Sequence, residues 1–597
     1  MIPVFVAAFA IRLVYFLQFR DSPVAGFFAV DTEAYHAFAV ELLKGNFFHP
    51  DTVFLSPLYP FFVAGIYGIL GAVPVAVAGC QAVLDALTCV ILYKAALLAF
   101  ERRSAALCAA LAYAFYATAI FYTGFLLDAT LTVFLNAVLI LVLLTMRTYP
   151  TRIGFVWAAG CLLGVLFLLR AHTAFLVPFV LFWIAGITKP TLRGVAACCA
   201  GIALLVIPFS FRNYLIEKRF SPFPVQSGIN FYIGNNPHAT GRYVTLEHIS
   251  DQAVQQVKDS FSLAQTRSVG SRLTECLSSD FSLQRAHRFK KYWQRIRQRV
   301  EEVKTPSDAS RYWFMQGVRF VVKHKAQAVR LALKKTLLYW NAEEVSLNVN
   351  YYFCRRFLPL LRLPLVSFGL IAPLALIGMA HSIRCRNEGV RLLALIVCGY
   401  LCSLVFYFVS ARYRMTALPA LTLLFSYGLV ESVRLARNLR WSSRLMLITL
   451  LGALLYLVHV PIDATNSRTN FAASYNNLGI VYGKEGKLDD AVTQFRLALA
   501  HDPRYVSAHF NLANAYAQKD LHAEALAEYE AVVSLDSAHA RAHNNLAVYY
   551  LLIYNEPGRA MEHYQTALAN GLEANPAFLF ELMNALQTSA PSVQPEK

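Results

Sequence analysis

IPVFVAAFAIRLVYFLQF, residues 2–19, precedes Asp31-Thr32-Glu33-Ala34-Tyr35, and a second apolar stretch begins at Ser56-Pro57-Leu58-Tyr59-Pro60. The first run has close to the roughly 20 apolar residues that a helix needs to cross a bilayer. Carboxylates are costly near lipid, and where a membrane protein carries them they tend to mark a functional site. The stretch therefore predicts a membrane helix followed by a loop whose acidic side chains carry chemistry.

The composition extends this interpretation to most of the chain. Of the 597 residues, 57% are hydrophobic and 15% are charged, whereas soluble proteins carry about 25% charged residues. The formal net charge is +18. In a membrane protein, loop lysines and arginines set the topology and bind anionic lipid headgroups. We therefore expect membrane lipids as partners and no nucleic acid.

Eleven apolar segments have about the length that crossing a membrane requires. The segment 57–72 is shorter and is interrupted by Pro60 and several glycines, which predicts a helix that lies at the interface or re-enters. The sequence thus predicts an all-α, polytopic membrane domain over residues 1–461. Its eleven predicted spans are 2–19, 75–99, 104–123, 128–146, 153–169, 173–187, 192–209, 360–382, 389–409, 415–434 and 443–461.

Loop charge predicts the orientation of these spans. With a cytoplasmic start, five turns face the cytoplasm and each of them is basic, as the positive-inside rule requires. This topology places Asp31, Glu33 and Asp128 outside, together with the long loop 210–356 and everything after residue 461. The first run has neither a basic n-region nor a small-residue cleavage site, so we expect it to be retained. The five turns are 101–103, 147–152, 189–193, 384–391 and 434–444.

Residues 472–573 repeat with a period of 34 residues. Leu478, Leu512 and Leu546 align at this spacing, and a tyrosine follows each leucine four residues later. The register of small and large residues resembles tetratricopeptide repeats, in which each unit is a helix pair that packs against the next pair. Three units predict an α-solenoid, which is either a structural cap or dimer surface or a groove for a peptide or protein. The tail 588–597 is predicted to be disordered.

A series of motifs accompanies the membrane segments: Arg12; Asp31 with Tyr35, Ala39 and Gly45; Ser56-Pro57-Leu58-Tyr59-Pro60; Gly71; Asp128; Gly234-Asn235-Asn236-Pro237 and Gly241; and Arg412-Tyr413-Arg414. In their order and loop placement, over about residues 1–460, they resemble the GT-C-fold glycosyltransferases of the protein mannosyltransferase and aminoarabinose transferase superfamily. The resemblance implies a polyprenyl-phosphate sugar donor at the outer membrane face and a first-loop acid that is a base or a metal ligand. The membrane domain with trailing repeats also resembles the transmembrane and tetratricopeptide-repeat O-mannosyltransferases.

Sugar transfer needs a base, because the acceptor hydroxyl must lose its proton as the phosphate leaves. We assign this role to Asp31. Glu33 is a second catalytic candidate, although residues two apart on a helix do not share a face. Asp128 is a third candidate, and at the start of its helix it could instead cap exposed backbone N–H groups. A divalent cation, Mg²⁺ or Mn²⁺, is a candidate cofactor, with Asp31 and Asp128 as its candidate ligands.

The donor phosphate needs positive charge, and arginine bonds phosphate oxygens through two parallel N–H groups. Arg412 and Arg414 stand at the predicted outer mouth of a span, against the positive-inside bias, and we expect them to hold the phosphate. Arg12 and Arg170, at or within spans, are expected to pair with interior acids such as Asp85 or with the phosphate. The remaining candidates are His324, Lys334 and Lys335 for the donor phosphate, and Tyr35, Tyr59 and Asn235 for the substrate.

Three functions compete at this point. The first is transfer of one sugar from a polyprenyl phosphate to a protein or glycolipid acceptor outside the cytoplasm, by default at a bacterial inner (plasma) membrane. The second is an oligosaccharide ligase or polymerase with a lipid-diphosphate donor, and the third is a non-catalytic anchor that presents a repeat scaffold. Acids and arginines that converge on one membrane face exceed the needs of an anchor and favour an enzyme. Cys276 and Cys354 share the long loop, and the sequence leaves open whether they form a disulfide.

Overall fold

The computed structural model is all-α in its described parts, apart from two isolated β-bridges. Its residues fall into two units, 1–249 with 310–469 (the membrane unit) and 250–309 with 470–597 (the repeat unit). The repeat unit is described below only through its residues after 470. The structure describes residues 1–27, 30–47, 56–188, 190–217, 224, 226–243, 306–384, 387–438, 440–462, 471–572 and 574–589.

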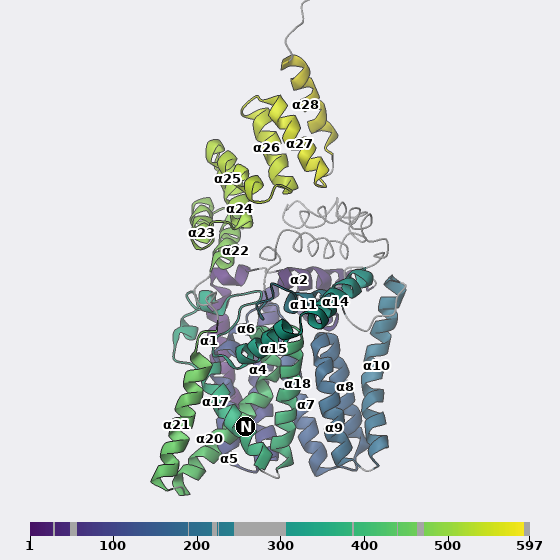
Figure 1. Ribbon diagram of the computed structural model, residues 1–597, viewed down its shortest axis with the longest axis vertical. Helices are drawn as coiled ribbons and strands as arrows, with labels where there is room; N and C mark the ends of the chain where they lie inside the picture. Colours follow the sequence, from purple (N-terminus) through teal and green to yellow (C-terminus); the bar gives the residue numbers. More distant parts are fainter. Residues whose placement is uncertain are drawn as a thin grey trace, which may run out of the picture. The chain divides into compact units, whose positions relative to one another are not determined.

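Seven described helices of the membrane unit are long and apolar enough to cross a bilayer. They run side by side as a bundle (Figure 1). The seven are α1 (Ile2–Arg20), α4 (Pro74–Phe100), α7 (Ala129–Thr148), α10 (Thr191–Glu217), α18 (Glu388–Phe406), α20 (Leu418–Asn438) with the turns before it, and α21 (Trp441–His459).

Four further apolar helices are shorter: α3 (Leu58–Leu70), α8 (Ile153–Leu169), η3 with α9 (Ala171–Ile187) and α17 (Phe368–Arg384). The 13 residues of α3 give a length of about 20 Å, in line with the expectation that 57–72 does not span. The predicted span 104–123 is not one helix. It is divided into α5 (Arg103–Ala114) and α6 (Ala117–Tyr122), so the count of eleven spans stays a prediction.

A buried ion pair accounts for the break between α5 and α6. Arg12 Nε donates to Asp85 Oδ2 at 2.8 Å, and neither side chain is more than 1% exposed. The same guanidinium donates to the backbone carbonyls of Tyr113 and Ala114. Arg12 thus gives the Ala114 carbonyl a partner at the end of α5, and the Tyr113 carbonyl also accepts from the backbone N–H of Tyr116, so the helix can stop inside the bundle.

Glycines let neighbouring helices approach closely. A side chain on Gly428 of α20 would place its Cβ 2.1 Å from the carbonyl oxygen of Leu374 in α17. A Cβ on Gly160 of α8 would lie equally close to the carbonyl oxygen of Cys198 in α10. Small residues at helix contacts are typical of membrane bundles, where backbones pack directly against one another.

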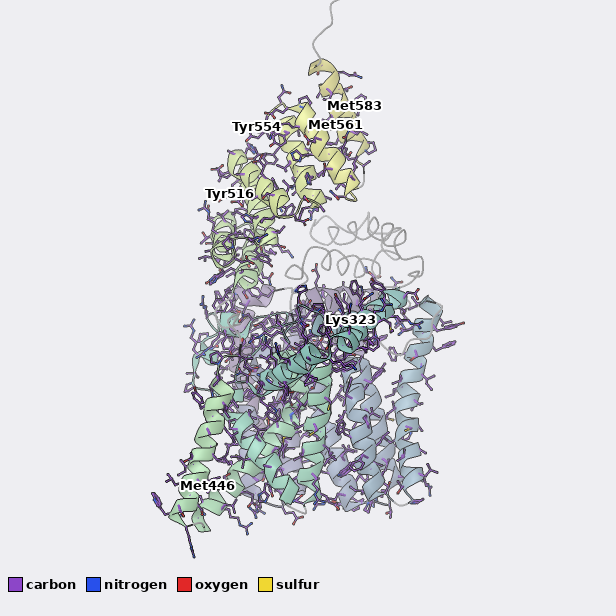
Figure 2. All side chains as sticks on the ribbon, in the orientation of Figure 1. Lys323, Met446, Tyr516, Tyr554, Met561 and Met583 are labelled. Carbon is purple, nitrogen blue, oxygen red and sulfur yellow. The ribbon has the colours of Figure 1, made fainter. Side chains whose placement is uncertain are left out.

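Several helices lie across one end of the bundle. They are α2 (Val30–Leu43), α11 (Gln226–Gly234) and α14 (Pro306–Lys323), with α15 (Lys325–Trp340) running obliquely below them (Figure 1). Met446, near the basic turn 434–444, lies at the opposite end of the bundle (Figure 2). The acidic first loop and this basic turn therefore occupy opposite ends, an arrangement compatible with the predicted topology.

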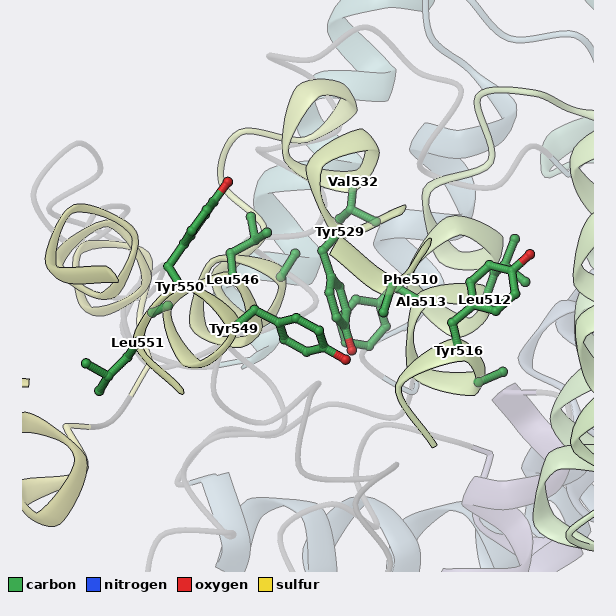
Figure 3. Close-up of a cluster of buried hydrophobic side chains, with 14 of the residues drawn as sticks. Phe510, Leu512, Ala513, Tyr516, Tyr529, Val532, Leu546, Tyr549, Tyr550 and Leu551 are labelled. Atoms are coloured by element: carbon green, nitrogen blue, oxygen red, sulfur yellow. The ribbon is translucent and has the colours of Figure 1, made fainter. Parts of the chain in front are cut away.

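The repeat unit is a row of helix pairs. Leu478, Leu512 and Leu546 are each at most 2% exposed, and consecutive pairs share one apolar core that includes Phe510, Tyr529 and Tyr550 (Figure 3). A further helix, α28 (Pro576–Ser589), follows the third pair and buries Leu582 in this core. The helix extends two residues into the stretch we predicted to be disordered from 588. The pairs are α22 (Ala472–Lys484) with α23 (Leu488–His501), α24 (Val506–Gln518) with α25 (His522–Leu535), and α26 (Ala540–Leu552) with α27 (Pro557–Ala569).

Candidate active site

A pocket in the membrane unit collects acidic and basic side chains that are far apart in the sequence. Asp31 and Tyr35 come from α2, Asp128 immediately precedes α7, and Arg170 separates α8 from η3. Arg412 lies on the short helix α19 (Ala411–Arg414). The pocket encloses about 550 Å³ of empty space, including its opening to solvent, and is lined by these five residues with Ser56, Leu169, Ala171, His172, Pro224, Gln226, Ser227, Asn230, Tyr407 and Tyr413.

Two arginines hold Asp128. Arg170 forms two parallel bonds with the carboxylate, Nε to Oδ2 at 2.6 Å and Nη2 to Oδ1 at 2.7 Å. Arg412 donates to Oδ1 from Nε at 3.0 Å and from Nη2 at 2.6 Å. Burial alone would raise the pKa of Asp128, but the charges and hydrogen bonds of the two arginines hold it well below its usual range. Asp128 therefore stays ionised and orients both guanidinium groups.

The prediction that Asp128 could cap its helix is wrong. Asp128 does occupy the N-cap position of α7, but its side chain makes no capping hydrogen bond. Both carboxylate oxygens instead accept bonds from Arg170 and Arg412. A buried carboxylate between two guanidinium groups finds charge-assisted partners that are stronger than backbone N–H groups.

Asp31 shares Arg412 with Asp128 but is more accessible. Its Oδ2 accepts a bond from Nη1 of Arg412 and another from Asn348 Nδ2 at 2.8 Å. Its Oδ1 has no hydrogen-bond partner among the described residues. The side chain is 21% exposed, against 3% for Asp128. Asp31 thus presents a carboxylate oxygen that can accept a proton, which the enclosed Asp128 does not.

Of the predicted substrate contacts, only Tyr35 lines the pocket. Its hydroxyl lies 3.3 Å from Arg412 Nη2, and its ring meets the Tyr59 ring edge to face at 4.8 Å. Tyr59 is fully buried behind it and donates to Gln81 Oε1 at 3.0 Å. Glu33, our second catalytic candidate, is exposed on α2 and does not line the pocket. Neither Tyr59 nor Glu33 lines the pocket, and their roles stay predictions.

Arg414 lies away from the pocket, although only one residue separates it from Arg412. Its Nη2 pairs with Glu344 Oε2 at 2.7 Å, and its Nη1 donates to the Asn341 carbonyl at 2.6 Å. Glu344 also accepts bonds from Tyr116 and Thr118. The two arginines point into different networks, and that of Arg414 joins the segment 341–344 to the bundle.

Lys335 and Asn235 bond to each other away from the pocket. Lys335 Nζ donates to Asn235 Oδ1 at 3.1 Å and to the Val405 carbonyl at 2.9 Å. Burial lowers the pKa of Lys335 to about 7. The other two predicted phosphate contacts, Lys334 and His324, do not line the pocket either, and His324 is exposed at the junction of α14 and α15.

The candidate metal ligands Asp31 and Asp128 face a guanidinium. Both carboxylates bond to Arg412, so positive charge already stands between them. Within the described ranges, no three His, Cys, Asp or Glu side chains gather as a metal site. A divalent cation at this site stays a prediction. Cys354 is a buried free thiol, and Cys276 lies outside the described residues.

Several residues of the site were not among the predicted catalytic and binding residues. His172 lines the pocket, and Asn348 bonds Asp31 without lining it. Arg170, which we expected to pair with an interior acid or with the phosphate, pairs with Asp128. Arg170 carried a signal, because an arginine directly after an apolar run needs a partner, and that partner is Asp128 rather than Asp85. His172 and Asn348 carried none, because a single histidine or asparagine has no pattern. Only the fold brings Asn348 against Asp31, 317 residues earlier in the chain.

Two segments of the chain match known protein families. Residues 49–211 match the family described as dolichyl-phosphate-mannose-protein mannosyltransferase, and residues 476–538 match the tetratricopeptide repeat. The first match includes Asp128 and Arg170. No curated protein sequence matches the chain.

Solved structures are also similar to the chain. The Archaeoglobus fulgidus oligosaccharyltransferase tethered to an NVT acceptor peptide is 13% identical, with a TM-score of 0.40 over 82% of this chain and 58% of that protein. The same enzyme with an inhibitory peptide and dolichol-phosphate is 13% identical, with a TM-score of 0.41 over 82% and 59%. The chain thus spans less than two thirds of the archaeal enzyme. The first repeat domain of Spaghetti (RPAP3), bound to an HSP90 peptide, is 22% identical, with a TM-score of 0.19 over 20% of this chain and 94% of that domain.

The family match confirms the predicted class of enzyme, and the apolar helices confirm an integral membrane protein. Residues 49–211 are thus similar to the dolichyl-phosphate-mannose-protein mannosyltransferase family, and residues 476–538, later in the chain, are similar to the tetratricopeptide repeat.

Proposed function

We propose that this protein transfers one sugar from a polyprenyl phosphate to a hydroxyl group of an acceptor outside the cytoplasm, with Asp31 as the base and Arg412 as the phosphate-binding residue. One observation carries the proposal: Asp31 and Arg412 meet in the same pocket, with Oδ1 of Asp31 free of partners among the described residues. A base and a cation in contact are what displacement of a phosphate by a hydroxyl requires.

The reaction is a single displacement. The acceptor oxygen forms a bond to C1 of the sugar while the bond from C1 to the phosphate oxygen breaks. The bonding electrons leave with the polyprenyl phosphate, and the hydroxyl proton passes to Asp31 Oδ1. Attack opposite the leaving phosphate inverts the configuration at C1. Asn348 and Arg412 both bond to Oδ2, so they fix the carboxylate while Oδ1 is left for the proton.

Arg412 contributes the positive charge for the leaving phosphate. Its guanidinium is 4% exposed and lines the pocket, so a phosphate oxygen beside it is shielded from water and attracted strongly. Asp128 and Arg170 position this group: Asp128 bonds Nε and Nη2, and Arg170 Nη1 donates to the backbone carbonyl of Arg412 at 2.9 Å. Asp128 is thus a positioning residue rather than a base.

We further propose that the repeat unit recruits the acceptor, a protein or glycolipid, on the extracytoplasmic side. Stacked helix pairs form a concave surface that suits an extended peptide. Asparagines join the first helices of the pairs, with Asn511 Nδ2 donating to Asn476 Oδ1 at 2.9 Å. Asn514 accepts a bond from Tyr529 at 2.6 Å.

The test compares glycoproteins and glycolipids of a deletion strain with those of its parent by mass spectrometry. We expect a product of the parent that carries one added sugar to disappear on deletion. It should return with the wild-type chain and not with Asp31→Asn. Loss of a multi-sugar product instead would favour the ligase or polymerase, and full rescue by Asp31→Asn would favour the non-catalytic scaffold.

A further inference from the structure

Part of the pocket lining, called here the polar wall, is uncharged, and its side chains make no hydrogen bond within the described part of the chain. Gln226, Ser227 and Asn230 of α11 line it together with Ser56 and His172. None of these five side chains has a hydrogen bond to another described residue. His172 is the most enclosed of the five: it is 8% exposed, and its Nε2 is buried without a partner.

An enclosed ring nitrogen without a partner calls for an explanation. Buried polar atoms in native structures nearly always have a hydrogen-bond partner, and the exceptions tend to have a functional reason. His172 borders a pocket that also contains an ion-pair network. In the empty pocket Nε2 is covered by neighbouring atoms, so a ligand group would reach it after a side-chain shift and would then supply the partner that no described residue provides.

The position of His172 indicates that the ligand group beside it is the sugar of the donor. His172 follows Arg170 by two residues, and its ring lies 5.0 Å from the ring of Tyr413, the residue after Arg412. A sugar is bonded through C1 directly to the phosphate oxygen. If Arg412 holds the phosphate, the groups beside it reach the hydroxyls of the sugar ring.

The chemistry of the wall suits a sugar. Each sugar hydroxyl both donates and accepts hydrogen bonds, and the amides of Gln226 and Asn230 and the hydroxyl of Ser227 do the same. A neutral imidazole offers one donor and one acceptor. The positively charged groups of the pocket, Arg412 and Arg170, both bond Asp128 and lie beside the proposed phosphate position. The two sets of side chains thus divide into a phosphate part and a hydroxyl part.

We propose that His172 and the α11 face formed by Gln226, Ser227 and Asn230 are the donor-sugar subsite, with His172 bonding one sugar hydroxyl and so helping to determine sugar specificity. This inference rests on the proposed function, because it places the sugar next to the phosphate that Arg412 holds.

The experiment measures the affinity added by the sugar. Full-length protein in detergent is titrated with dolichyl phosphate and with dolichyl phosphates that carry mannose, glucose, galactose or N-acetylglucosamine, without acceptor. Wild type should bind at least one sugar-bearing lipid more tightly than dolichyl phosphate. In His172→Ala the affinity for the sugar-bearing lipid should fall about tenfold, which is the effect of one hydrogen bond. The affinity for dolichyl phosphate should not change. His172→Asn should recover part of the loss, and Asn230→Ala should lower the same gain.

The controls separate this inference from the proposed function. His381→Asn, in the same unit but outside the pocket, should bind every lipid as wild type does. Arg412→Ala should weaken the binding of all the lipids by a similar factor. Unchanged binding in this variant would count against the assignment of Arg412 to the phosphate. An unchanged sugar gain in His172→Ala would overturn the subsite, as would a wild type for which no sugar adds affinity. The subsite would also be overturned if both His172→Ala and His172→Asn lost as much affinity for dolichyl phosphate as for the sugar-bearing lipids. His172 would then act on the phosphate or on the fold.

Discussion

Asp31 and Arg412 form an ion pair across 381 positions of the chain, and the same guanidinium also bonds Asp128. One arginine thus links two carboxylates of unequal exposure. The enclosed carboxylate is bonded on both oxygens, while the more accessible one keeps an oxygen for chemistry. This asymmetry supports the proposal that Asp31 is the base and that Asp128 positions the arginines.

Asp128→Asn is expected to destabilise the membrane unit. The change removes the countercharge of two buried arginines, and breaking a buried ion pair from one side costs about 3–5 kcal/mol. The melting temperature in detergent, followed by tryptophan fluorescence, should fall clearly. Asp31→Asn is the matched control, because Asp31 is partly exposed and engages one arginine, so its melting temperature should change much less. Similar melting temperatures for both variants would contradict the division of roles.

Arg412 and Arg414 are expected to behave differently. Arg412→Ala should weaken binding of dolichyl phosphate, and Arg412→Lys should restore it only in part, because a point charge lacks the planar fork of a guanidinium. Arg414→Ala leaves Glu344 without its cationic partner and the Asn341 carbonyl without the Arg414 donor, so it should lower the melting temperature while the folded fraction keeps wild-type affinity. Calorimetric titration checks both variants, and weakened binding confined to Arg414→Ala would reverse the assignment.

Lys335→Met should gain stability relative to wild type at low pH. The pKa of Lys335 is about 7 in the fold and about 10.4 in an unfolded chain. Between these values the unfolded state binds the extra proton, so wild-type stability rises with pH; below about 7 the full cost of burying the charge remains. The advantage of the variant in melting temperature should therefore be largest near pH 6 and shrink toward pH 9. A constant difference over this range would contradict a lysine of lowered pKa.

Deleting residues 472–597 is expected to reduce transfer to the natural acceptor and to spare transfer to a small soluble one. Sugar incorporation into each acceptor measures this with the purified membrane part. Equal loss on both acceptors would show that the repeats only stabilise the protein.

A reporter fused after Lys597 should read as extracytoplasmic, and a cytoplasmic signal would overturn the predicted topology.

Local patterns in the sequence predicted much of this structure, whereas long-range pairing did not follow from them. Apolar length predicted the bundle helices, and the period of 34 residues predicted the repeats, because both depend on residues close in sequence. The division of 104–123 into two helices was not predictable, because it depends on Arg12 reaching the end of α5 from another helix. Arg412 and Arg414 looked equivalent for the same reason: their partners, Asp128 and Glu344, lie in separate parts of the chain.

The most direct test of the central claim is the turnover of purified full-length Asp31→Asn with a sugar-bearing dolichyl phosphate and an acceptor. The amide keeps the size of the side chain and removes its basicity. We expect transfer to fall by roughly 10²–10⁴-fold, with the affinity for dolichyl phosphate retained through Arg412. Near-normal turnover in this variant would contradict the assignment of Asp31 as the base.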